Sequence, residues 1–132
     1  MATVRDVMST DLVTVEPSAT IAEAATLMGG RRVGSALVLE GGRLVGILTE
    51  RDVLRALADH FDAAGHPVGQ WMTPRPTTID AGATVHDALE LMLARGFRHL
   101  PVTEDDRLVG MVSMRDLSRA AIGPGPSGPV LL

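Results

Sequence analysis

The sequence contains no cysteine and no lysine. The absence of cysteine excludes disulfides, thiolate metal sites and cysteine nucleophiles. All 12 basic side chains are arginine, so a charged phosphate contact would come from a forked guanidinium. The formal net charge is −4 and no basic block is present. A nucleic-acid partner, which would favour a basic face, is therefore not expected.

Aromatic residues make up only 2% of the chain, against 45% for apolar residues as a whole. The core must therefore consist mainly of aliphatic side chains. No apolar run approaches membrane-spanning length, and the N-terminus lacks a signal-peptide pattern, so we expect a cytoplasmic protein without a membrane partner. No Gly-x-Ser-x-Gly sequence, metal-ligand pair or Walker motif occurs, so neither an enzyme nor a metal site is expected.

A ten-residue phrase occurs twice in the chain. Arg43–Asp52 has the sequence RLVGILTERD, and Arg107–Asp116 has the sequence RLVGMVSMRD. When the chain is shifted by 64 residues, residues 4–57 align with residues 68–121 without a gap, and roughly a third of the aligned positions are identical. Self-similarity at a fixed period indicates paired units that share a core.

Each repeat begins with a short predicted strand, at residues 13–15 or 77–79, followed by a helix. Apolar residues at i, i+3, i+4 and i+7 predict the helices, which begin at Ile21 and Val85. Hydroxyl-x-x-acid sequences before both helices predict capping boxes, in which a hydroxyl and a carboxylate each accept a backbone N–H. The pairs are Thr20 with Glu23 and Thr84 with Asp87.

Each repeat continues with a predicted hairpin and a second helix. Apolar runs flank a turn at Glu40–Arg43 in the first repeat and at Asp105–Asp106 in the second. The second helices follow Thr49 and Ser113. Both repeats have the predicted order β-α-β-β-α, so we expect a mixed α/β protein of the α+β class. Met28 and Met92, at helical spacing, are expected in the core.

Two hydroxyl-x-x-Asp sequences, Thr49–Asp52 and Ser113–Asp116, stand where a strand is expected to pass into a helix. One interpretation is a further pair of capping boxes, which needs no ligand. The other is a ligand site, because a helix N-terminus favours an anion and a nearby carboxylate can accept hydrogen bonds from ribose. Gly46 and Gly110 would let another group approach the strand closely. The two roles are compatible.

The two units, with a VMS or WMT sequence near the start and the RLVG phrase near the end, resemble a pair of CBS domains, a Bateman module. The resemblance covers about residues 3–122. It implies two tandem repeats packed with pseudo-twofold symmetry and two clefts that bind AMP, ADP, ATP or another adenosyl ligand. The hydroxyl of the motif would contact phosphate, its Asp would contact ribose, and the first strand would frame adenine through its backbone. The implied site residues are Thr14, Val15, Gly46, Thr49, Asp52, Thr78, Ile79, Gly110, Ser113 and Asp116.

The resemblance also implies that a basic pair in one repeat reaches the phosphate bound by the other. Arg98 and His99 are this pair, and Gly34 and Ser35 occupy the aligned positions in the first repeat. We therefore expect the Thr49 cleft to hold phosphate-bearing ligands more tightly than the Ser113 cleft.

The expected boundaries are a first repeat at residues 1–60, a junction at 61–67, a second repeat at 68–122 and a flexible Gly/Pro-rich tail at 123–132. His60, His66 and His86 show no ligand spacing, and Trp71 is assigned to packing.

The expected function is that of a non-catalytic sensor that requires no cofactor, binds an adenine nucleotide as regulatory ligand and signals through a conformational change. A homodimer and a client protein are the expected protein partners. The alternative is a structural dimerisation module without a physiological ligand.

Overall fold

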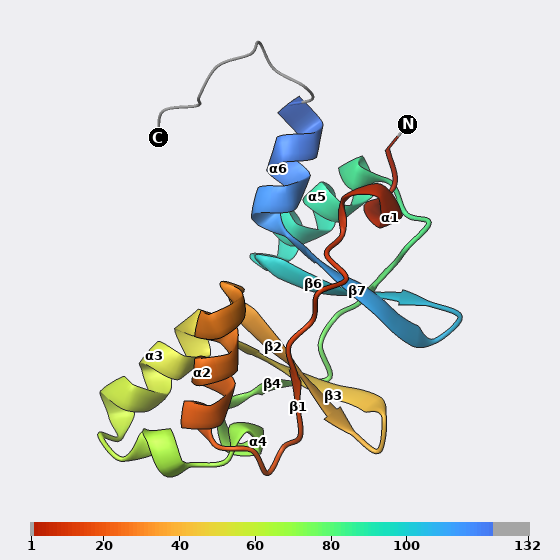
Figure 1. The fold of residues 1–132 in the computed structure, drawn as a ribbon. Helices are drawn as coiled ribbons and strands as arrows, with labels where there is room; N and C mark the ends of the chain where they lie inside the picture. The colour runs from red at the N-terminus through yellow and green to blue at the C-terminus, as the bar shows by residue number, and fades with distance from the viewer. Residues whose placement is uncertain (1, 123–132) are drawn as a thin grey trace. The chain divides into compact units, whose positions relative to one another are not determined.

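The computed structural model describes residues 2–122, and the tail expected at 123–132 lies outside them. The chain forms two compact units (Figure 1). One comprises residues 10–78 and is called the Thr49 unit. The other joins residues 2–9 to residues 79–122 and is called the Ser113 unit.

The Thr49 unit contains a four-stranded sheet in the order β1-β2-β3-β4. Strands β1 and β2 are parallel, and the other neighbours are antiparallel. The predicted order β-α-β-β-α is confirmed, and three short elements, η1, α4 and β4, follow it. The elements are β1 (Thr14–Val15), α2 (Ile21–Arg31), β2 (Ser35–Glu40), β3 (Arg43–Thr49), α3 (Glu50–Asp59), η1 (Ala63–Gly65), α4 (Val68–Trp71) and β4 (Thr73–Pro74).

The Ser113 unit repeats this arrangement with a three-stranded sheet in the order β5-β6-β7. The register is the same, because Ile79 pairs with Val102 as Val15 pairs with Val38. The first strand begins at Ile79, later than the predicted Thr77, since parallel pairing with β6 begins only there. The elements are α1 (Val4–Val7), β5 (Ile79–Asp80), α5 (Val85–Arg95), β6 (His99–Glu104), β7 (Arg107–Ser113) and α6 (Met114–Ile122).

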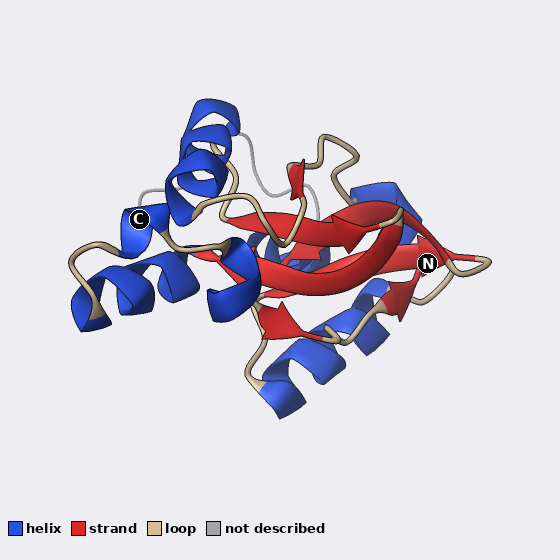
Figure 2. Ribbon diagram, turned by 90° about the horizontal axis from the view of Figure 1, so that it is seen from below, coloured by secondary structure: helices blue, strands red, loops and turns tan. Residues whose placement is uncertain are grey.

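Both hairpins turn through two residues with positive φ. Gly41 and Gly42 have φ angles of 58° and 79°, and Asp105 and Asp106 have φ angles of 50° and 62°. A two-residue turn of this hand matches the twist of the flanking strands and favours Gly, Asn or Asp. Both turn predictions are confirmed, and Figure 2 shows the hairpin strands in red.

The helices of each unit pack on its sheet, and α2 and α3 lie side by side against the β1–β4 sheet (Figure 1). In the Thr49 unit the buried side chains of α2 contact those of β2 and β3, and Met28 is among them. Met92 of α5 lies in the corresponding core of the Ser113 unit. The prediction that these two methionines fill the cores is confirmed. Of the helices described, none is long and apolar enough to cross a membrane.

The opening segment of each sequence repeat packs in the other unit. Strand β4, from the start of the second repeat, pairs with β3 of the Thr49 unit, where Thr73 is opposite Ile47. Ser9, from the start of the first repeat, forms an antiparallel bridge with Met111 of β7, with N–O distances of 2.8 and 2.9 Å. The sequence repeat and the compact unit are therefore not the same set of residues.

The short helices α1 and α4 are exchanged in the same way. The Val68 N–H donates to the Ala19 carbonyl at 2.7 Å, and the Val4 N–H donates to the Ala83 carbonyl at 2.8 Å. Val4 and Val68 are both fully buried. The short helices α4 and α1 are thus hydrogen-bonded to the residues that precede the caps of α2 and α5.

Two capping-box predictions, at Thr20 and Thr84, are only partly confirmed. The Thr20 and Thr84 hydroxyls accept the N–H of Glu23 and Asp87 at 3.1 and 3.0 Å, as predicted. The reciprocal carboxylate-to-backbone bonds do not form at these described helix starts, so that half of the prediction is wrong. The backbone here instead forms isolated bridges, from Thr20 to Pro67 and from Thr84 to Thr3.

Candidate functional site

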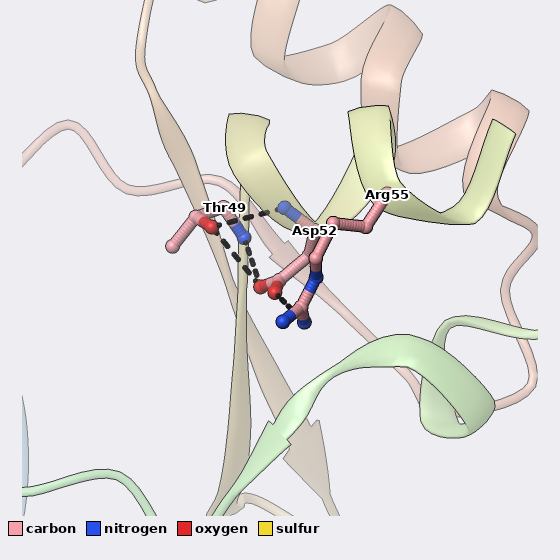
Figure 3. A network of polar contacts seen from close by, with 3 residues as sticks. All are labelled: Thr49, Asp52 and Arg55. Atoms are coloured by element: carbon pink, nitrogen blue, oxygen red, sulfur yellow. Dashed lines mark hydrogen bonds and ion pairs between the residues drawn. The ribbon is translucent and has the colours of Figure 1, made fainter. Parts of the chain in front are cut away.

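Thr49 and Asp52 form a complete capping box at the start of α3 (Figure 3). The Asp52 Oδ2 atom accepts the Thr49 backbone N–H at 2.9 Å and the Thr49 hydroxyl at 3.0 Å. In return, the Asp52 N–H donates to the Thr49 hydroxyl at 3.3 Å. Asp52 is only 4% exposed, so this carboxylate belongs to the fold as well as to any site.

The second oxygen of Asp52 is also occupied. Arg55, one turn further along α3, places Nη2 at 2.7 Å from Asp52 Oδ1 (Figure 3). The Arg55 side chain itself is exposed. A ribose hydroxyl that reached Oδ1 would therefore share it with Arg55 or displace the guanidinium.

Ser113 and Asp116 build the same box at the start of α6. Asp116 Oδ2 accepts the Ser113 N–H at 3.0 Å and its hydroxyl at 2.8 Å, and the Asp116 N–H donates to that hydroxyl at 3.2 Å. Arg119 aligns with Arg55, but within residues 2–122 it forms no ion pair with Asp116. The two helix starts thus share the cap and differ at the second carboxylate oxygen.

The glycines of the RLVG phrase make room for methionines of the exchanged segments. A Cβ built on Gly46 would lie 2.3 Å from the Met72 sulfur and 3.1 Å from the Thr73 carbonyl oxygen. A Cβ on Gly110 would lie 2.6 Å from the Met8 sulfur. The expected close approach to these strands is made by the protein itself, so the glycines do not need a ligand to explain them.

The candidate adenine-framing residues lie at the first strand of each unit. Thr14 is exposed and Val15 is buried in β1, and Ile79 is buried at the start of β5 just after the exposed Thr78. On β2, Val15 pairs with Val38 and Thr49 pairs with Ser35. Ser35 and Val38 are three residues apart along β2, which is a distance of about 10 Å. Strands β1 and β3 lie on opposite sides of β2, so the spacing between the TV sequence and the helix start also includes two inter-strand distances of about 4.8 Å.

Arg98 and His99 lie beside the helix start of their own unit. His99 pairs with Ser113 across β6 and β7, and the Arg98 carbonyl accepts the Met114 N–H at 2.8 Å. The Arg98 side chain is exposed. Gly34 occupies the equivalent place beside α3, where its carbonyl accepts the Glu50 N–H at 3.1 Å. The predicted reach of Arg98 to the Thr49 site concerns the other unit and stays a prediction.

A further hydroxyl-x-x-Asp sequence, missed in the sequence analysis, caps α1. The Thr3 N–H donates to Asp6 Oδ2 at 2.9 Å, and the Thr3 hydroxyl donates to the same oxygen at 3.2 Å. These bonds, the backbone one first, lower the pKa of Asp6 below its ordinary value of 3.8. This box lies outside the predicted site residues, so the pattern by itself does not identify a ligand site.

Sequence reasoning also missed the Arg55 ion pair and the methionine contacts to the glycines. Met8 and Met72 are identical positions of the repeat, as are Arg55 and Arg119, so the alignment carried a signal. No group of three His, Cys, Asp or Glu side chains in the described part of the chain could hold a metal ion.

Two β-α-β-β-α units with matching sheet register and helix caps define a tandem module, and the comparison with known families identifies it. A family model for the CBS domain matches residues 4–59 and again residues 68–123, so the chain belongs to the CBS domain family and carries two copies. The CBS domain-containing protein YhcV of Bacillus subtilis is 39% identical over 119 residues, which cover 89% of this chain and 84% of that protein.

Two solved structures with adenosyl ligands have a similar fold. The Arabidopsis thaliana protein CBSX2 in complex with AMP gives a TM-score of 0.80 at 30% identity, covering 92% of this chain and 97% of that one. The CBS domain pair of protein MJ0100, in complex with 5′-methylthioadenosine and S-adenosyl-L-methionine, gives a TM-score of 0.85 at 27% identity, covering 93% and 98%.

Proposed function

We propose that this protein is a non-catalytic regulatory module that binds an adenine nucleotide or another adenosyl ligand through its CBS pair. The observation that carries the proposal is the pair of hydroxyl-x-x-Asp helix starts, which stand in the same sheet register in both units. The AMP and S-adenosyl-L-methionine complexes of the two similar structures support an adenosyl ligand class.

Each motif residue has a role in this proposal. The N-terminus of α3 or α6 supplies partial positive charge for a phosphate. The Asp52 and Asp116 carboxylates accept ribose hydroxyls, and the backbone of the first strands, at Thr14–Val15 and Thr78–Ile79, frames the adenine. Ligand binding would shift the population of conformations, and a partner would respond to that shift.

We propose a homodimer, a client protein and a cytoplasmic location as the setting for this signal. Large apolar side chains are exposed on α3 and just after it: Leu54 at 69% and Leu57 at 43%, which lie three residues apart on one face of the helix, and Phe61 at 96%. Contiguous exposed apolar surface favours a protein partner. Light scattering at micromolar concentration should give the mass of a dimer, and a monomer mass would contradict this part of the proposal.

A dimerisation module without a physiological ligand is the second candidate. It is favoured by the box at Thr3 and Asp6, which shows that the motif can serve as a cap alone. A ligand that binds only the native state raises the melting temperature by mass action, whereas this candidate has no such response. A thermal-shift panel of AMP, ADP, ATP, S-adenosylmethionine and NADH separates the two.

The variant Asp52→Ala tests the proposed role of the motif. Loss of the cap should cost about 1 kcal/mol of stability. Loss of a charged acceptor for ribose should weaken adenosine binding by about 1.5–3 kcal/mol in titration calorimetry. Asp6→Ala removes a similar box from α1 and is the matched control, with unchanged binding. Equal binding by wild type and Asp52→Ala would leave Asp52 as a cap only.

A further inference from the structure

The only tryptophan of the chain lies in a cluster of rings next to α4. The Trp71 indole N–H donates to His66 Nδ1 at 3.2 Å, and the two rings are stacked with centroids 6.2 Å apart. His60 contacts both, at 5.4 Å from the His66 ring and 5.7 Å from the Trp71 ring. These contacts therefore connect the segment between α3 and α4, which holds both histidines, to Trp71, the last residue of α4.

The hydrogen bond defines which tautomer the neutral imidazole of His66 adopts. Because Nδ1 accepts the indole N–H, the neutral imidazole carries its proton on Nε2. Nε2 lies 3.4 Å from Asp62 Oδ1, a suitable acceptor. A second proton on Nδ1 would place two donors, the imidazolium and the indole, against each other, and the Trp71 bond would be lost.

The groups around His66 do not replace that bond. Within residues 2–122, His66 forms an ion-pair contact with Asp62 and a ring contact with the titratable His60. Asp62 is 64% exposed, so its attraction for an imidazolium is screened by water. His60, if also protonated, would repel the imidazolium. From helix α2, the Ile21 N–H donates to the His66 carbonyl at 2.9 Å.

The cluster stands directly before the segment that packs on β3. Met72 follows Trp71 and lies against Gly46, and Thr73 of β4 pairs with Ile47. Thr49, the cap of α3, is two residues beyond Ile47. Trp71 thus directly precedes the segment that pairs with β3, close to the helix start that carries the candidate site.

We propose that protonation of His66 releases Trp71 and loosens the α4–β4 segment from β3, which makes the Thr49 unit sensitive to pH. The Ser113 unit lacks this device, because Ala2 and Val7 align with His66 and Trp71. The proposal goes beyond ligand binding and does not depend on it. It follows from one hydrogen bond whose acceptor, the Nδ1 atom of His66, can no longer accept once it carries a proton.

Fluorescence of the full chain tests the release, because the emission comes from Trp71 alone. Release of Trp71 from His66 changes the surroundings of the indole, so the emission of wild type should change in a single transition as the pH is lowered from about 8 to 5. His66→Gln should abolish the transition and His60→Gln should retain it. His86→Gln is the matched control, since His86 also has a carboxylate at i+4, Glu90, but lies in α5.

Hydrogen exchange tests the consequence for packing. After correction for the chemical rate, the amides of residues 71–73 and of Arg75 should exchange roughly two- to ten-fold faster at pH 5 than at pH 8, as the loss of one hydrogen bond permits. Residues 7–11, the aligned segment, should not change. A transition that persists in His66→Gln, equal changes in both segments, or a simultaneous loss of far-UV ellipticity would overturn the proposal.

Discussion

The Thr49 unit and the Ser113 unit have the same strand order, the same register and the same cap at the second helix, but their surroundings differ at each cap. Asp52 is held by Arg55, whereas Asp116 has no such ion pair in the described residues. Beside the caps lie Gly34 in one unit and Arg98 in the other. A histidine–tryptophan hydrogen bond is present only in the Thr49 unit among the residues described.

The comparison teaches that a repeated motif specifies a repeated backbone before it specifies a repeated site. The hydroxyl-x-x-Asp box satisfies free N–H groups at a helix start, which is a local requirement. The contacts that a bound ligand would make depend on the side chains around each cap, which the hydroxyl-x-x-Asp box does not determine. The two units should therefore respond alike to changes in the backbone contacts and differently to changes around the carboxylates.

The largest expected effect concerns a contact that both units share. Gly46→Val and Gly110→Val should each destabilise the fold by about 3 kcal/mol, because the added carbons collide with a methionine and a backbone carbonyl. Chemical denaturation measures the loss. Gly30→Ala in α2, where no atom lies within 4 Å, should instead stabilise by about 0.5–1 kcal/mol. A large loss of stability in only one of the two variants would show that Met72 and Met8 do not pack equivalently against their glycines.

The next effect tests whether the basic pair makes the two sites unequal. Arg98→Ala should weaken AMP binding by about 1.5 kcal/mol, the value of a charge-assisted hydrogen bond, with little change for adenosine, which lacks the phosphate. Titration calorimetry with both ligands measures it. Arg31, a guanidinium at the end of α2, pairs with Asp11 and would have to give up that pair to contact a phosphate. Two equal AMP sites, or equal losses for both ligands, would contradict the asymmetry.

A smaller effect is expected from the arginine on α3. Arg55→Ala should cost about 0.3–0.5 kcal/mol of stability, since the guanidinium is exposed and the pair is screened. If the Thr49 site binds ribose, the same variant should strengthen adenosine binding, because Asp52 Oδ1 becomes free. Arg119→Ala is the matched control and should change neither quantity. Equal effects of the two variants would remove this difference between the units.

The smallest effect is the acid dependence of the cap on α1. The pKa of Asp6 is lowered in the folded state, so its contribution is complete above the ordinary value of 3.8 and is lost as the pH falls through the folded value. The stability difference between wild type and Asp6→Asn should therefore shrink between pH 7 and pH 3 in urea unfolding. Gln70, the aligned residue on α4, carries no charge, so Gln70→Ala should show no such pH dependence.

Most of the secondary structure could be predicted from the sequence, because its signals are local. Apolar spacing located the helices after Thr20 and Thr84, and Gly-Gly and Asp-Asp located the turns, since few residues tolerate two positive φ angles in succession. The boxes at Thr49 and Ser113 were also predicted, because all their atoms lie within four residues. The half-formed box at Thr20 was not predicted; the residues on either side of Thr20 form backbone hydrogen bonds with residues 66 and 68, which no local pattern encodes.

The sequence by itself determined that the chain is a doubled β-α-β-β-α module, because the pattern of apolar residues, turns and caps depends on neighbours within a few positions. Only the tertiary structure decided which residues make up a compact unit. Residues 68–74 open the second repeat, yet they pack on β3 of the first, and residues 4–9 make the reverse exchange. No local pattern encodes that exchange, because the fit of Met72 against Gly46 and of Met8 against Gly110 exists only once distant strands lie side by side.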